Sequence, residues 1–373
     1  MSVPFSIGYS GAVLDEGLET REGNSQIRLK TVDEILALFR FNDPSPDSYL
    51  RIITDTVMGN RTQDAAVGYL TTHFSPGVFG QCVKFPSANA RVVLPGNYER
   101  YGQLSNFSLR MRAKFDSIPN QYLISKWGWS YQRTFTVFVG GGATWGGLTL
   151  YTSADGNNYG GPANNNLPAW SGWHDLQFVM GSSNKYLAIS LDGEKKAEQI
   201  NSPYLPLFNP PENLFVPVCL NGYLNVGGLS NFFVDELILY GKEMPTDYAP
   251  ATETCKPFYQ TSPTAKLSLD SGMNNSAWAP GSLTFAEETD LAAGGIKLRY
   301  HLDNDNTPVF TGDPMTLAVF KTLGTLSGRY LHLEFTFYSD GDSPRTLTSG
   351  SIQLTPRSLP GIMARRQPEI VRK

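Results

Sequence analysis

The segment NFSLRMRAKF, residues 106–115, shows the pattern on which the fold depends. Apolar and polar residues alternate along it, with Phe107, Leu109, Met111, Ala113 and Phe115 set against Ser108, Arg110, Arg112 and Lys114. Because successive side chains of a β-strand point to opposite faces, this alternation predicts a strand with one apolar and one basic face. WHDLQFVM (173–180) and YLAISL (186–191) alternate similarly, and Asp192-Gly193 is a two-residue hairpin signal. These segments predict an antiparallel sheet.

The composition agrees with this pattern. Among 373 residues, 40% are apolar and 17% charged, and the 36 glycines and 25 prolines suit short strands joined by tight turns. The length predicts two or three all-β domains. The net charge of −4 supplies no field that would attract nucleic acid, so no nucleic-acid partner is expected. Three cysteines are an odd number without metal-site spacing, and no apolar run approaches about 20 residues, so no membrane insertion is expected.

Several segments together resemble a known module. ILALFRFND (35–43) and NFFVDELILYGKEM (231–244) resemble the first and last strands of laminin G-like, concanavalin A-like domains. NFSLRMRAKF, WHDLQFVM and YLAISLDGE follow in the order of that family. The resemblance implies a jelly-roll β-sandwich over residues 35–245. A helix at 32–39 is the alternative for the first segment, because Thr31 and Glu34 have capping-box spacing, but FRFND and the resemblance favour a strand.

A second all-β unit is predicted at 258–356, after a proline-rich linker at 246–257. IKLRYHL and RYLHLEFTFYS alternate, and AKLSL, SLTFAE, MTLAVF and SIQL complete six or seven strands, the size of an immunoglobulin-like β-sandwich. RYLHLEFTFYSDGDSPRTLTSGSIQL (329–354) also resembles the small sandwiches of bacteriophage tail and baseplate proteins.

Two terminal arms are predicted outside these sandwiches. Residues 1–34 carry six acids and three bases with little periodicity, which is typical of an extended N-terminal arm. Residues 357–373 carry five bases and one acid and predict a basic C-terminal arm.

The sequence predicts no catalytic site. Some jelly-roll relatives are glycoside hydrolases with an E-x-D-x-x-E strand. The nearest match, Glu288-Thr-Asp290, has Ala293 where the second glutamate belongs. The four histidines stand in no metal motif, and the glycines of 140–147 lack the Lys-Ser/Thr of a phosphate loop. A non-enzymatic protein is therefore expected.

A structural calcium ion is the one cofactor that the resemblance implies. Asp235, in the closing strand, and Asp43, near its expected neighbour, match positions where lectin-like domains hold Ca²⁺. Such an ion needs six to eight oxygens, which these residues do not supply. The favoured alternative is that Asp235 and Glu236 satisfy backbone groups in a buried sheet.

Two neighbouring loops combine aromatic rings with amides, as carbohydrate sites do. The candidate residues are Trp145, Asn157, Asn158, Tyr159, Asn164 and Trp170, with Asn165 and Asn166 beside them. The alternative is that these asparagines serve only as turn residues, since asparagine tolerates left-handed backbone conformations.

These observations favour a structural component of a virus particle, from the tail, baseplate or capsid of a tailed bacteriophage. Its arms would hold other virion proteins and further copies of the chain in a homo-oligomer, assembled in the host cytoplasm. The alternative is a lectin-like adhesion protein that binds a host-surface glycan through the loops of 140–172.

Overall fold

The computed structural model describes residues 2–41, 52–54, 61–63, 73–85, 92–93, 106–115, 121–127, 133–140, 147–164, 172–208, 215–216 and 232–356. The chain divides into two compact units. The larger unit comprises residues 31–257. The smaller unit combines residues 1–30 with residues 258–373, so the larger unit is inserted between two parts of the smaller one.

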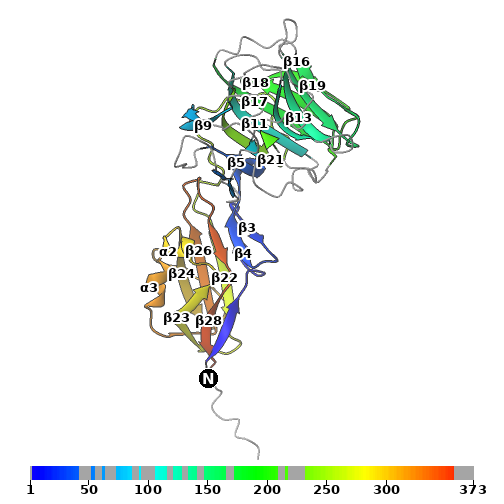
Figure 1. The fold of residues 1–373 in the computed structure, drawn as a ribbon. Coiled ribbons are helices and arrows are strands. Elements are labelled where there is room, and N and C mark those ends of the chain that lie inside the picture. Colours follow the sequence, from blue (N-terminus) through cyan, green and yellow to red (C-terminus); the bar gives the residue numbers. More distant parts are fainter. Residues whose placement is uncertain are drawn as a thin grey trace, which may run out of the picture. The chain divides into compact units, whose positions relative to one another are not determined.

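Two antiparallel sheets form the larger unit (Figure 1). The eight-stranded sheet has the order β19-β18-β17-β11-β21-β9-β8, and β5 also pairs with β21. Its strands are β5 (Ile35–Phe39), β8 (His73–Pro76), β9 (Gln81–Phe85), β11 (Asn106–Phe115), β17 (Trp173–Gly181), β18 (Tyr186–Leu191), β19 (Glu194–Gln199) and β21 (Phe232–Tyr240). A 3₁₀ turn, η1 (Val32–Glu34), precedes β5, so the strand predicted there is confirmed.

The seven-stranded sheet has the order β10-β20-β12-β13-β14-β15, with β16 also pairing with β14. Its strands are β10 (Val92–Val93), β12 (Gln121–Trp127), β13 (Arg133–Gly140), β14 (Gly147–Ser153), β15 (Tyr159–Gly160), β16 (Ala163–Asn164) and β20 (Phe215–Val216). A separate pair joins β6 (Ile52–Thr54) and β7 (Arg61–Gln63).

Alternation along the strands builds the core between the two sheets. Phe107, Leu109 and Met111 of β11 are buried there, together with Phe135 of β13 and Leu150 of β14. The rings of Phe107 and Phe135 lie 5.6 Å apart between centroids. The apolar face predicted for residues 106–115 is therefore the face that holds the sandwich together.

The smaller unit is also built of β-sheets. One four-stranded sheet has the order β1-β28-β23-β25, a second has the order β2-β22-β26-β24, and a three-stranded sheet has the order β27-β4-β3. The elements are β1 (Val3–Ile7), β2 (Val13–Leu14), β3 (Leu18–Arg21), β4 (Gln26–Leu29), β22 (Thr264–Asp270), β23 (Ala277–Phe285), α2 (Thr289–Ala292), β24 (Ile296–Asp303), α3 (Leu317–Lys321), β25 (Leu326–Ser327), β26 (Tyr330–Phe337), β27 (Thr346–Thr348) and β28 (Gly350–Thr355). The predicted all-β fold, a large sandwich followed by a smaller one, is thus confirmed.

The extended N-terminal arm predicted for residues 1–34 differs from the structure. β1 pairs with β28 over five residues, from Val3 opposite Leu354 to Ile7 opposite Gly350. Ile7 and Tyr9 are buried in the core of the smaller unit, and the Tyr9 hydroxyl donates to the Thr348 carbonyl oxygen at 2.6 Å. The first 30 residues are therefore part of the smaller sandwich and no separate arm, while the second part of that sandwich begins at residue 258, as predicted.

One predicted strand of the smaller unit is a helix. MTLAVF was assigned to a strand, but Leu317–Lys321 form α3. The Thr316 hydroxyl accepts a hydrogen bond from the Val319 amide as an N-cap, which explains why the helix begins there. The predicted basic arm at 357–373 lies outside the described residues.

Candidate functional site

A tight hairpin joins β14 to β15 in the seven-stranded sheet. Asp155 organises it, because its Oδ1 accepts hydrogen bonds from the amides of Asn157 at 2.8 Å and Asn158 at 2.7 Å. Its Oδ2 accepts from the Asn158 side chain at 2.7 Å. These hydrogen bonds to the charged form lower the pKa of Asp155 below its usual value. The hairpin is therefore held by a carboxylate that stays ionised.

Two tyrosines meet beside this hairpin. Tyr159 stands opposite Ser153 in the β14–β15 register, which places it diagonally from Tyr151 on the outer face of the sheet. The two rings meet edge to face, with centroids 5.5 Å apart and planes at 89°. Tyr159 remains 46% exposed. A partner ring thus positions an exposed aromatic ring at the surface.

A third aromatic ring lies on the same face. Phe138 of β13 stands opposite Thr149 of β14, one diagonal step from Tyr151, and is half-buried. Tyr151 is half-buried as well. Phe138, Tyr151 and Tyr159 therefore follow a diagonal across three strands, which we call the aromatic diagonal.

The carbohydrate residues predicted from the sequence are placed in part. Asn157, Asn158 and Tyr159 lie together on the hairpin. Asn164 ends β16, where its backbone pairs with Leu148, while Trp145 and Trp170 lie outside the described residues. The side-chain amide of Asn158 donates to Asp155 within the turn. For Asn158 this agrees with the alternative given above, that the asparagines are turn residues. Tyr151 and Phe138 were missed, although their alternation with Leu150 and Val137 already placed them on the outer face.

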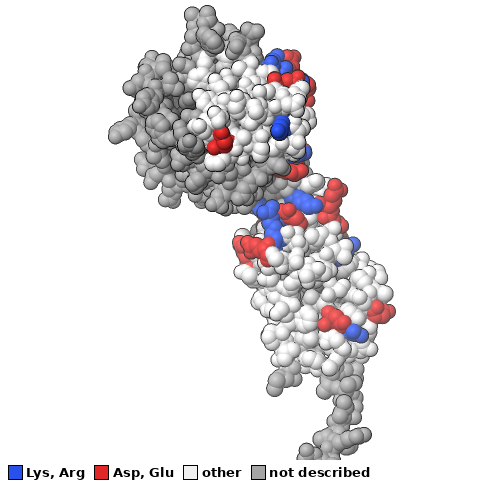
Figure 2. Space-filling view, turned by 90° about the vertical axis from the view of Figure 1, so that its right-hand side faces the viewer, with Lys and Arg blue, Asp and Glu red and all other residues white. Residues whose placement is uncertain are grey.

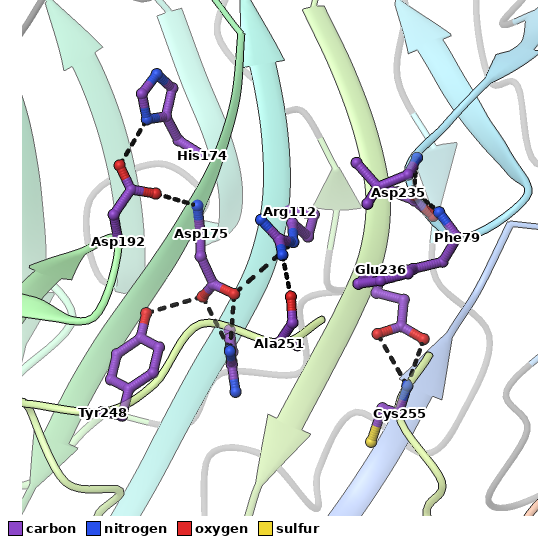
Figure 3. A network of polar contacts seen from close by, with 12 residues as sticks. Phe79, Arg112, His174, Asp175, Asp192, Asp235, Glu236, Tyr248, Ala251 and Cys255 are labelled. Carbon is purple, nitrogen blue, oxygen red and sulfur yellow. Dashed lines mark hydrogen bonds and ion pairs between the residues drawn. The ribbon is translucent and has the colours of Figure 1, made fainter. Parts of the chain in front are cut away.

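Asp235, the candidate calcium ligand, binds backbone groups. It is fully buried in β21, and its Oδ2 accepts hydrogen bonds from the amides of Val78 and, at 2.8 Å, Phe79 (Figure 3). Burial raises its pKa. Its Oδ1 is buried without a hydrogen-bond partner.

The described residues do not form a calcium site around this carboxylate. Among them, no group of three His, Cys, Asp or Glu side chains could hold a metal ion. Asp43, the second candidate ligand, lies outside the described residues. The calcium site therefore stays a prediction.

The outer face of the eight-stranded sheet is covered by residues 241–257, which we call the strap. Asp175 of β17 is its main anchor. Arg110 of β11 donates Nε to Asp175 Oδ1 and Nη2 to Oδ2, both at 2.8 Å, and the Tyr248 hydroxyl donates to Oδ1 at 2.8 Å. The Arg110 guanidinium also lies 4.6 Å from the centroid of the Tyr248 ring. This buried ion pair attaches the strap to the middle of the sheet (Figure 3).

Further side chains of the sheet hold the backbone of the strap. Gln177 donates to the Pro245 carbonyl oxygen at 2.6 Å, and Ser190 donates to that of Thr246 at 2.6 Å. Arg112 donates to the Ala251 carbonyl oxygen, and Glu236 accepts from the Cys255 amide at 3.0 Å. Burial raises the pKa of Glu236 to about 7. The segment 246–257, predicted as a linker, therefore has no regular structure but is bound to the sandwich along its length.

His174 also has a structural position. Its Nδ1 lies 2.7 Å from Asp192 Oδ2, and Asp192 Oδ1 accepts from the Asp175 amide at 2.9 Å (Figure 3). The histidine thus ties the start of β17 to the turn after β18.

The smaller unit contains a Ser-His-Asp cluster that sequence analysis missed. His332 is fully buried, with Nδ1 2.7 Å from Ser268 Oγ and Nε2 3.1 Å from Asp303 Oδ2. Asp303 also accepts from the backbone amides of Asn306 and Thr307, at 3.0 and 2.8 Å. The β22 backbone around Ser268 pairs with β26 along one edge. Ser268 and Asp303 thus give the buried histidine a partner at each ring nitrogen.

Comparisons with known proteins show no family. No family model matches the chain, and no curated protein matches it. In the described part of the chain, no helix is long and apolar enough to cross a membrane.

Several solved structures share the β-sandwich architecture at low similarity. Domain 4 of an extracellular arabinanase from Geobacillus stearothermophilus, solved with arabinotriose, is 12% identical, with a TM-score of 0.41 over 58% of this chain and 96% of that one. The binding domain of botulinum neurotoxin serotype C1 is 10% identical, with a TM-score of 0.43 over 75% of this chain and 63% of that one. Trypanosoma rangeli sialidase, solved with sialic acid, is 12% identical, with a TM-score of 0.34 over 57% of this chain and 31% of that one. Similarities of this size identify no ligand for this chain.

Proposed function

We propose that the larger unit is a carbohydrate-binding module and that the chain binds its ligand without turning it over. The observation that carries the proposal is the exposed ring of Tyr159, held edge to face against Tyr151 on a hairpin that Asp155 organises. A sugar ring presents a patch of C–H groups that stacks on an aromatic face. Because the tyrosine is already positioned, little side-chain freedom is lost when a sugar binds.

The position of the strap supports this choice of face. The outer side of the eight-stranded sheet binds residues 241–257 of its own chain through Asp175, Gln177, Ser190 and Glu236. A ligand there would have to displace those hydrogen bonds. The aromatic diagonal, on the seven-stranded sheet, carries half-buried and exposed rings instead.

A glycan array tests the proposal. We expect the intact chain to bind at least one glycan class, Tyr159→Ala to weaken that binding about ten-fold or more, and Tyr159→Phe to retain it. Tyr338→Ala is the matched control, because Tyr338 is a 36% exposed tyrosine of the smaller unit. An array without binding, or a Tyr159→Ala variant that binds as the unaltered chain does, would contradict the proposal.

The two predicted tryptophans supply a separate arm of this test. Trp145 precedes the hairpin in the sequence and Trp170 follows it, and each is replaced by alanine. We expect each substitution to weaken binding of the same glycan if the two tryptophans share the site with Tyr159. Loss of binding in the tryptophan variants without loss in Tyr159→Ala would move the site away from the aromatic diagonal.

A second candidate function is a structural component of a virus particle. The observation that favours it is the order of the chain. Residues 31–257, the larger unit, are inserted between two parts of the smaller unit, so the chain joins the two units at both ends of the larger one. The basic segment 357–373 would then bind the smaller unit to a neighbouring protein. The test is incorporation of a chain truncated after residue 356 into its assembly, where normal incorporation would exclude docking by this segment.

A further inference from the structure

We propose that the sugar bound at Tyr159 is uncharged, and that the site discriminates against sialylated, sulfated or uronic acid glycans. This inference rests on the proposed function and specifies its ligand class. It follows from the charge of the surface around the aromatic diagonal.

The strands and turn that carry Tyr159 bear charge of one sign. Residues 147–164 form β14, β15, β16 and the hairpin, and their one formally charged side chain is Asp155. Within this described segment there is no lysine, arginine or histidine to pair with a carboxylate or sulfate. In the neighbouring strand β13, the first residue is Arg133. Figure 2 shows groups of Lys and Arg as well as Asp and Glu side chains on the described surface of the larger unit, on the side that it presents.

Asp155 opposes an anionic ligand directly. It is exposed and only four positions from Tyr159 in a tight hairpin. Both of its oxygens accept hydrogen bonds from Asn157 and Asn158, and these bonds favour the ionised form. The carboxylate is therefore negative at neutral pH, where the acidic groups of glycans are ionised as well.

Neutral sugars meet no such obstacle. The ring of Tyr159 offers an apolar face, and Asn157 and Asn158 bring polar amide groups to the same hairpin. Hydroxyl groups accept and donate hydrogen bonds without a net charge, so the Asp155 carboxylate does not repel them. It is the acidic substituent, and not the sugar ring, that the site disfavours.

The test compares neutral and sialylated forms of one oligosaccharide on the full chain. We expect the neutral form to bind more tightly, with the difference shrinking as salt is raised because exposed charges are screened. Asp155→Asn keeps an Oδ1 for the two backbone amides and removes the charge. Measured relative to the neutral form on the same variant, binding of the sialylated form should tighten about three-fold, the effect of one unit charge roughly 6 Å away in water.

The test distinguishes failure of the charge preference from failure of carbohydrate binding. Equal or tighter binding of the sialylated form by the unaltered chain would overturn the charge preference while leaving carbohydrate binding intact. The absence of binding by either form would overturn the proposed function itself. Binding of the neutral form by Asp155→Asn shows that the hairpin is still folded, and the comparison on the unaltered chain decides the inference if that variant does not fold.

Discussion

The two outer faces of the larger sandwich differ in how their side chains are used. On the eight-stranded sheet, the half-buried Arg110 and the buried Asp175 and Glu236 bind the strap. On the seven-stranded sheet, the aromatic diagonal ends in the exposed ring of Tyr159. Polar residues on a sheet face therefore do not by themselves indicate a binding site. In this protein the charged face is structural, and the aromatic face is the better candidate for a ligand.

Loss of the strap's main anchor should have the largest effect on stability. Asp175→Ala leaves the half-buried Arg110 guanidinium without its carboxylate. Removing one partner of a buried ion pair costs about 3–5 kcal/mol, and the partial exposure of Arg110 places the loss towards the lower end of this range. Urea unfolding of the full chain measures the change. Glu198→Ala is the control, since it removes an exposed ion pair with Lys195 and should leave the unfolding midpoint nearly unchanged. Equal effects of the two variants would mean that Asp175 is no anchor.

Glu236 should make the strapped face sensitive to pH. Its pKa is raised from 4.5 to about 7, chiefly by burial, with Arg40 and Asp235 as its charged neighbours. Because the folded state holds this proton more tightly than the unfolded state, the contribution of Glu236 to stability is largest below pH 4.5 and falls as pH rises towards about 7. The loss is on the order of 3 kcal/mol.

The Glu236→Gln variant isolates this contribution. We expect the free energy of unfolding of the variant, relative to the unaltered chain, to rise between about pH 4.5 and 7 and to level off above. Urea unfolding at a series of pH values measures it. A difference that does not change with pH would show that Glu236 does not titrate in this range.

The Tyr248 hydroxyl should have a smaller effect. Tyr248→Phe keeps the ring beside Arg110 and removes the hydrogen bond to Asp175, which should cost about 1.5–3 kcal/mol because the acceptor is charged. The measurement is again urea unfolding. If Tyr248→Phe proves as destabilised as Asp175→Ala, the substitution has displaced the ring and has not removed the hydrogen bond alone.

The aromatic face should contribute least to stability. Tyr159→Ala removes a ring that is 46% exposed, so the free energy of unfolding should fall by only about 1 kcal/mol, from the edge-to-face contact with Tyr151. Thermal or urea unfolding checks this. A large loss of stability would mean that Tyr159 is a packing residue, and it would remove the contrast between the two faces.

The strands of the sheets could be predicted from the sequence more readily than the pairing and the connections between them. Alternation along residues 106–115 predicted both faces of β11, because the two-residue period of a strand is a local property. The N-terminal strands could not be predicted because they are two to five residues long and their partners are distant in the sequence. Tyr9 and Thr348, for example, are 339 positions apart. The helix α3 could not be predicted because an apolar run of this length fits a strand or a helix, and the Thr316 cap decided between them.

Part of the candidate site could be predicted in the same way. Asn157, Asn158 and Tyr159 stood out as amides beside an aromatic ring, and the structure brings them together on one hairpin. Tyr151 and Phe138 could not be joined to them without the register of β13, β14 and β15. The strap could not be predicted, since residues 246–257 have no periodicity. Apart from the side chains of Asp247 and Tyr248, they bind through backbone groups that every sequence possesses.

The amino-acid sequence by itself determined the all-β class, the apolar faces of the long strands and the candidate tyrosine hairpin, because each depends on residues close together in the chain. Only the tertiary structure decided that residues 1–30 complete the smaller sandwich, that residues 241–257 cover one face of the larger one, and that Tyr151 supports Tyr159. These features depend on pairing between segments, and a pairing is selected by the burial and hydrogen bonds that both partners gain together.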